Sequence, residues 1–139
     1  MRRAFTIIEI TVTFCILSIL SAIAIPWAGR VLDSVRVRSA GVEIESLFSA
    51  ARHIAIARAA QATVDIDTAA QSMRVSVGGD IVRRRDIGTA HDVRISANRV
   101  RMSYSATGMG YGAANLSVVV RRNASADTVF VSRLGRVRH

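Results

Sequence analysis

The sequence has no lysine, and its 19 basic residues are all arginine. It has one cysteine, which excludes an internal disulfide and a zinc site built from cysteines. Aromatic residues make up only 5% of the chain, so a core has to be built from valine, isoleucine, leucine and alanine. The single proline excludes a proline-rich linker. The length of 139 residues suits one modest domain, and a hydrophobic fraction of 50% excludes a disordered chain.

Hydrophobic residues and charges are unevenly distributed along the chain. Residues 10–29 carry no formal charge, and as a helix they would extend roughly 30 Å, the thickness of the hydrocarbon core of a bilayer. Of the net charge of +9, residues 1–73 contribute +1 and residues 74–139 contribute +8. The sequence therefore predicts a membrane-spanning N-terminal segment and a basic C-terminal half.

The residues around the apolar segment limit its interpretation. Arg2 and Arg3 precede it, and the positive-inside rule predicts that they stay in the cytoplasm. A secretory signal peptide, with small residues at Ala22 and Ala24 before the cut, is one alternative. Glu9 argues against it, because a carboxylate in an apolar segment costs about 3 kcal/mol of insertion free energy unless it has a partner.

The N-terminal motif Ala4-Phe5-Thr6-Ile7-Ile8-Glu9, followed by a long apolar helix, resembles the class III leader junction of type IV pilins and type II secretion pseudopilins. In that family a prepilin peptidase cuts just before the phenylalanine and methylates its new amino group. The resemblance implies a leader peptide over residues 1–4, cleavage between Ala4 and Phe5, and N-methylation of Phe5. The family has glycine where this chain has Ala4. Glu9 becomes the fifth mature residue, which is the assembly glutamate of the family.

Physical chemistry suggests how Glu9 acts in assembly. A carboxylate in an apolar medium strongly prefers a neighbouring opposite charge. The amine of a cleaved Phe5 in an adjacent subunit supplies that charge when the helices stack in a filament. We hypothesise that this pair drives extraction from the membrane and sets the register. The alternative is that Glu9 lies at the level of the lipid headgroups.

The N-terminal helix is expected in two parts, a membrane or filament-core segment over residues 5–29 and an amphipathic continuation over residues 30–60. Apolar residues at three- and four-residue steps predict the face that covers a sheet. They are Ala40, Ile44, Leu47, Phe48, Ala51, Ile54 and Ala55. A different face carries Val31, Val35 and Val42, and it either contacts neighbouring subunits or is only locally apolar.

Residues 61–139 are expected to form a β-rich head. Alternating or continuous apolar runs predict strands at 62–67, 73–77, 81–83, 93–95, 100–104, 116–120, 128–131 and 136–138. One long helix followed by strands is an α+β arrangement. The expected fold is a long N-terminal helix, embedded in the membrane over its first half, packed on a small antiparallel β-domain.

The C-terminal sequence from Val129 to Arg138 is similar to the last strands of the GspH/FimT class, which read apolar-Val-Ser, two variable residues and Gly-Arg-x-Arg. This resemblance implies a minor pseudopilin, a structural subunit of a type II secretion pseudopilus anchored in the inner membrane. It implies a single-pass chain with a cytoplasmic N-terminus and a periplasmic head, later extracted into a filament. The implied partners are other pseudopilins or pilins, the prepilin peptidase and the inner-membrane assembly platform.

The C-terminal arginines suggest an alternative function, a minor type IV pilin that binds DNA for uptake in natural transformation. Arginine binds phosphate with two parallel hydrogen bonds, and an excess of +8 resembles a phosphate-binding surface. A solvated basic face without a ligand explains the same composition, because arginine replaces lysine throughout. The candidate DNA-binding residues are Arg121, Arg122, Arg133, Arg136 and Arg138.

The remaining motifs do not indicate catalysis, so the sequence predicts no enzyme, no cofactor and no metal site. Asp65 and Asp67 share the exposed face of a predicted strand, and the glycine-rich segment 108–112 lacks the Lys-Ser/Thr of a phosphate-binding loop. Residues 83–85 are three arginines at a strand end, which discourages aggregation between sheets. The three histidines lack metal-ligand spacing, and they are His53, His91 and His139.

Overall fold

The computed structural model describes residues 6–111, 115–132, 134 and 136–138. Its first element is the helix α1 (Ile7–Ala57), which has 51 residues. The chain divides into two compact units, residues 1–32 and residues 33–139. α1 contributes to both units, and each unit is described by itself.

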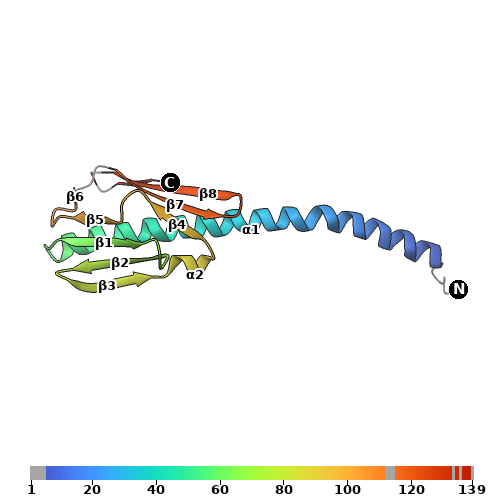
Figure 1. Ribbon diagram of the computed structural model, residues 1–139, viewed down its shortest axis with the longest axis horizontal. Coiled ribbons are helices and arrows are strands. Elements are labelled where there is room, and N and C mark those ends of the chain that lie inside the picture. The colour runs from blue at the N-terminus through green and yellow to red at the C-terminus, as the bar shows by residue number, and fades with distance from the viewer. Residues whose placement is uncertain (1–5, 112–114, 133, 135, 139) are drawn as a thin grey trace. The chain divides into compact units, whose positions relative to one another are not determined.

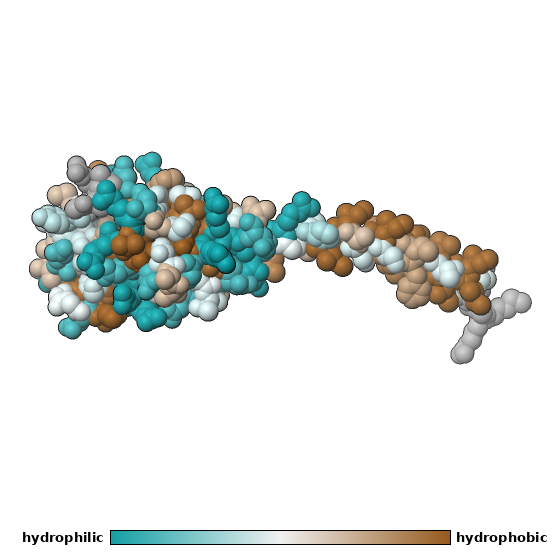
Figure 2. All heavy atoms as spheres, in the orientation of Figure 1, coloured by the Kyte–Doolittle hydropathy of each residue, from teal (hydrophilic) through white to brown (hydrophobic). Residues whose placement is uncertain are grey.

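The first unit is an apolar helix whose side chains are all exposed from Thr6 to Leu32. Ile7 is 82% exposed and Trp27 is 65% exposed, values that are unusual for such large apolar side chains in water. An 18-residue window of α1 reaches a mean hydropathy of 2.3 with none of it buried, long and apolar enough to cross a membrane. Figure 2 shows this segment as largely hydrophobic.

In the second unit, α1 buries one stripe of its surface against the head. The buried residues recur at three- and four-residue steps, as the sequence predicts, and Ile54 is partly buried beside them. Gly41 lies within this stripe, where a Cβ atom would be 3.3 Å from Oδ2 of Asp127 and 3.8 Å from Cγ2 of Val129. A larger side chain at Gly41 would therefore press against β8 (Ser125–Val131). The stripe consists of Val37, Ala40, Gly41, Ile44, Leu47, Phe48, Ala51 and Ala55.

A five-stranded antiparallel sheet forms one part of the head, in the order β3-β2-β1-β5-β6. In its central strand, Ala62, Val64 and Ile66 are buried while the residues between them are less so, which is the period-two pattern of a half-buried strand. All six residues of the edge strand β3 are exposed. The strands are β1 (Ala62–Asp67), β2 (Ser72–Val77), β3 (Asp80–Arg85), β5 (Arg101–Tyr104) and β6 (Gly110–Tyr111).

A second antiparallel sheet has four strands in the order β4-β7-β8-β9. Its inner face carries apolar side chains from β7 and β8, and both sheets share one core with the stripe of α1 (Figure 1). The α+β fold predicted from the sequence, a long helix on antiparallel strands, is confirmed. The strands are β4 (Arg94–Ala97), β7 (Leu116–Arg122), β8 (Ser125–Val131) and β9 (Val137–Arg138).

Two short elements were not predicted from the sequence, the helix α2 (Ile87–His91) and the strand β6. Five and two residues are too few for a periodic pattern to emerge. The predicted strand at 116–120 continues to Arg122, because Asn123 adopts a left-handed conformation (φ 49°) and makes a tight hairpin to β8.

A glutamine side chain joins the two sheets. Gln71 follows the turn after β1, and its amide bonds both backbone groups of Ile95 in β4: Nε2 donates to the carbonyl at 3.1 Å, and Oε1 accepts from the N–H. The side chain thereby acts as one residue of an additional strand at the edge of the four-stranded sheet. Gly88 of α2 packs on Gln71 so closely that a Cβ at Gly88 would collide with the Cβ of Gln71.

Candidate functional site

The N-terminal turn of α1 holds Glu9 in a helix-capping arrangement. Thr6 precedes the helix, and its hydroxyl accepts a hydrogen bond from the backbone N–H of Glu9 at 3.3 Å. Threonine followed three residues later by glutamate is the sequence of a capping box. The side chain of Glu9 is exposed. Ala4 and Phe5, the predicted cleavage and methylation residues, lie outside the described residues.

Polar side chains in the apolar segment bond to their own helix. The hydroxyls of Thr11, Thr13 and Ser18 each donate to a carbonyl one turn earlier, at 2.7–2.9 Å. These bonds satisfy the hydroxyl donors without water, which a helix surrounded by lipid requires. Glu9 is the one formally charged residue in the sequence from Thr6 to Gly29.

Arg122 lies in an ion-pair network within the head and does not lie on the outer face of its sheet. Its Nε donates to Oδ1 of Asp33 at 2.6 Å, and its Nη1 pairs with the carboxylate of Asp92 and bonds the Asp92 carbonyl at 2.5 Å. Asn123 donates to Asp33 at 2.8 Å, and Arg36 pairs with Asp92 at 3.2 Å. Only 18% of the Arg122 side chain is exposed. Arg122 is therefore not available for DNA binding, unlike the exposed candidate arginines.

This network shifts the acidity of its members. The hydrogen bond from Asn123, followed by that from Arg122, lowers the pKa of Asp33 below its usual value of 3.8. The hydrogen bond from Arg122 lowers the pKa of Asp92 in the same way. The two carboxylates in turn raise the pKa of Arg122. The network fastens α1 to the end of β7 and to the residue after α2, a structural role.

The other described candidate arginines are exposed. Arg121 projects from the outer face of β7 and lies directly across from Arg94 of β4. Arg138 of β9 lies across from Phe130 of β8, which is 56% exposed. Like charges facing each other across strands are destabilising, and the described residues of this outer face include no acid. Arg133 lies outside the described residues.

The sequence patterns do not single out Arg94, and they group Arg121 and Arg122 in one basic patch. Adjacent residues of a strand point to opposite faces, so the pattern itself indicates that Arg121 and Arg122 separate. The pairing of Arg94 with Arg121 depends on the antiparallel register of β4 and β7. Eighteen residues lie between these strands, so no local pattern reveals their register.

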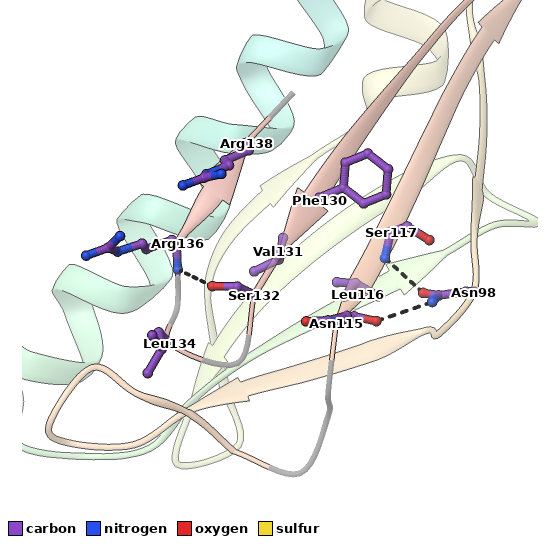
Figure 3. A pocket seen from close by; sticks show the side chains of 10 residues that line it. All are labelled: Asn98, Asn115, Leu116, Ser117, Phe130, Val131, Ser132, Leu134, Arg136 and Arg138. Atoms are coloured by element: carbon purple, nitrogen blue, oxygen red, sulfur yellow. Dashed lines mark hydrogen bonds between the residues drawn. The ribbon is translucent and has the colours of Figure 1, made fainter.

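A shallow hollow of about 640 Å³ lies at one end of the four-stranded sheet (Figure 3). The amide of Asn98 organises one side, since Oδ1 accepts from the N–H of Ser117 at 2.9 Å and Nδ2 donates to the carbonyl of Asn115 at 3.3 Å. Exposed apolar side chains of Phe130 and Leu134 line the hollow together with Arg136 and Arg138. Among the described residues, no group of three or more His, Cys, Asp or Glu side chains is placed to hold a metal ion.

Similarity to known proteins is found in the fold and not in the sequence. No protein-family model and no curated protein matches the sequence. A solved structure of the type IV minor pilin FimU from Pseudomonas aeruginosa superposes with a TM-score of 0.64 at 15% identity, covering 73% of this chain and 86% of that chain. The chain has a pilin-like fold. A second crystal form of FimU gives a TM-score of 0.61 at 15% identity, with 73% and 90% covered.

Proposed function

We propose that this protein is a minor subunit of a pilin-type filament anchored in the inner membrane, with a structural and not a catalytic role. One observation carries the proposal: the described apolar residues before Leu32 are all exposed, on a chain whose head has its own closed core. Covering such a helix requires lipid before assembly and other apolar helices after it. The pilin-like fold supports this assignment.

Maturation follows from the N-terminal motif. The prepilin peptidase cuts between Ala4 and Phe5 and methylates the new amine of Phe5. The capped first turn at Thr6 then presents Glu9 near the new N-terminus. Glu9 pairs with the Phe5 amine of an adjacent subunit as the apolar helices pack together, because an ionised carboxylate in an apolar medium is costly unless it is paired.

We assign the filament to a type II secretion system, in which the protein is a minor pseudopilin. The basis is the resemblance of the sequence from Val129 to Arg138 to the last strands of the GspH/FimT class. Its partners are the other pseudopilins and the assembly platform in the inner membrane. The N-terminus lies in the cytoplasm and the head in the periplasm, as Arg2 and Arg3 before the apolar segment indicate.

A second candidate function is DNA binding during uptake, and the outer face of the four-stranded sheet favours it. Arg94, Arg121 and Arg138 lie on this face, with the exposed ring of Phe130 between strands that carry them. Arginine and an aromatic ring are the side chains that bind phosphates and stack on bases.

Filament incorporation tests the first proposal. Glu9→Gln keeps the size of the side chain and removes its charge, so membrane insertion should persist and recovery in sheared filaments should be lost. Ile10→Val, one residue away, should be incorporated like the wild type. Normal incorporation of Glu9→Gln contradicts the assembly role of Glu9.

The two systems are separated by double replacement of Arg94 and Arg121, which face each other on this sheet, with glutamine. A secretion subunit retains protein export in this variant, whereas a DNA-uptake subunit loses transformation. Affinity for duplex DNA should fall steeply with salt only if the face binds phosphates.

A further inference from the structure

A narrow groove of about 250 Å³ runs between α1 and the edge strand β9. α1 contributes Glu45, Ser49 and Arg52, which follow each other at four- and three-residue steps and so share one side of the helix. β9 and the residue before it contribute Arg136 and Arg138. Figure 3 shows these two side chains extending toward α1.

One of the residues that line the groove, Arg52, has incomplete hydrogen bonding. Nε of Arg52 is buried and has no hydrogen-bond partner among the described residues, and the buried hydroxyl of Tyr104 also has none. The turn at Gly108, which has a φ of +76°, passes so close that a Cβ there would be 3.1 Å from this nitrogen. A buried donor without a partner costs free energy, and the close turn at Gly108 limits the movement of the Arg52 side chain that lines the groove.

The charges of the groove are unbalanced. Among the described residues that line it, three carry guanidinium groups and one, Glu45, carries a carboxylate. Within the described part of the chain, Arg52, Arg136 and Arg138 form no ion pair, whereas arginines elsewhere in the head do. Among the described strands, β9 lies at the edge of its sheet, beside β8.

We propose that this groove binds a glutamate or aspartate side chain of a neighbouring filament subunit; the partner rests on the function proposed above, and the carboxylate chemistry does not. A planar carboxylate matches the paired donors of arginine, and Ser49 adds a hydroxyl. A groove of about 250 Å³ admits a single side chain and not a DNA duplex.

The test uses the full-length chain in detergent micelles and follows the Nε–H signals of arginine by ¹⁵N NMR. The probe is a terminally blocked Gly-Glu-Gly peptide, and the matched control is Gly-Gln-Gly. The Arg52 signal should shift and saturate with the first peptide and not with the second. Arg52→Lys keeps the charge but loses the paired donors, and it should weaken binding about tenfold. The exposed Arg58→Lys on the same helix should bind like the wild type.

Three results would overturn the proposal: an Arg52 signal that does not move, an equal shift with the glutamine peptide, or displacement of the peptide by duplex DNA, which would assign the groove to nucleic acid. Replacing Arg136 and Arg138 with glutamine leaves the core intact and should also abolish the shift. Filament recovery is measured in parallel, so that a failure of the proposed function can be distinguished from a failure of carboxylate binding. If the wild type is absent from filaments, the proposed function fails while the titration still judges the carboxylate site.

Discussion

Shortening Gln71 by one methylene should remove its hydrogen bonds to the second sheet and lower the free energy of unfolding of the head. Gln71→Asn retains an amide and suits the left-handed backbone at this position (φ 52°), but its amide no longer reaches Ile95. Two hydrogen bonds are lost, each contributing about 1 kcal/mol. Because Ile95 is only 3% exposed, its N–H and carbonyl are then left without partners. We expect a loss of about 3 kcal/mol in the free energy of unfolding.

The assay is thermal unfolding of the head in the detergent-solubilised chain, followed by near-ultraviolet circular dichroism. A loss of about 3 kcal/mol corresponds to a fall in Tm of roughly 15 °C for a head of this size. Gln61→Asn is the matched control, since Gln61 is exposed, and its Tm should stay within about 2 °C of the wild type. If Gln71→Asn melts together with this control, the side-chain bridge does not stabilise the head.

Three further predictions follow from the head. Asp33 and Asp92 have lowered pKa values, so their ion pairs stabilise the fold above pH 3.8 and lose this effect as the pH falls further; the stability difference between wild type and Arg122→Gln, measured by denaturation, should shrink below pH 3.8, and a constant difference contradicts this. Gly88→Ala should lower the Tm of the head, because its Cβ would collide with the Cβ of Gln71, whereas Gly29→Ala, whose Cβ would meet nothing within 4 Å, should not; equal melts would show that the contact relaxes. Burial raises the pKa of Tyr104 to about 12, so the unfolded chain ionises first and stability should fall above pH 10; Tyr104→Phe should remove that fall.

The helix and most strands are predictable because their patterns are local. Burial of Ile44, Leu47, Phe48 and Ala51 follows from the three- and four-residue spacing of apolar side chains. The strands around Val64 and Val118 follow from alternation and from a continuous apolar run. α2 escapes prediction because five residues do not establish a period.

The candidate site is less predictable because its contacts join distant residues. Arg122 meets Asp33 across 89 positions, and Gln71 meets Ile95 across 24. The alternation of a strand places Arg121 and Arg122 on opposite faces, but it does not show that Arg122 forms an ion pair with Asp33. The groove that includes Arg52 likewise depends on the packing of β9 beside α1, which only the folded head defines.

The central claim is that this chain is processed and assembled as a pilin-type subunit, and its intact mass tests this most directly. The full-length chain is expressed with a prepilin peptidase, extracted from the membrane and weighed by mass spectrometry, with a sample lacking the peptidase as control. The account predicts a chain that lacks residues 1–4 and carries one added methyl group on Phe5. A chain of unchanged mass in the presence of the peptidase, or one that begins at Ile25, contradicts it.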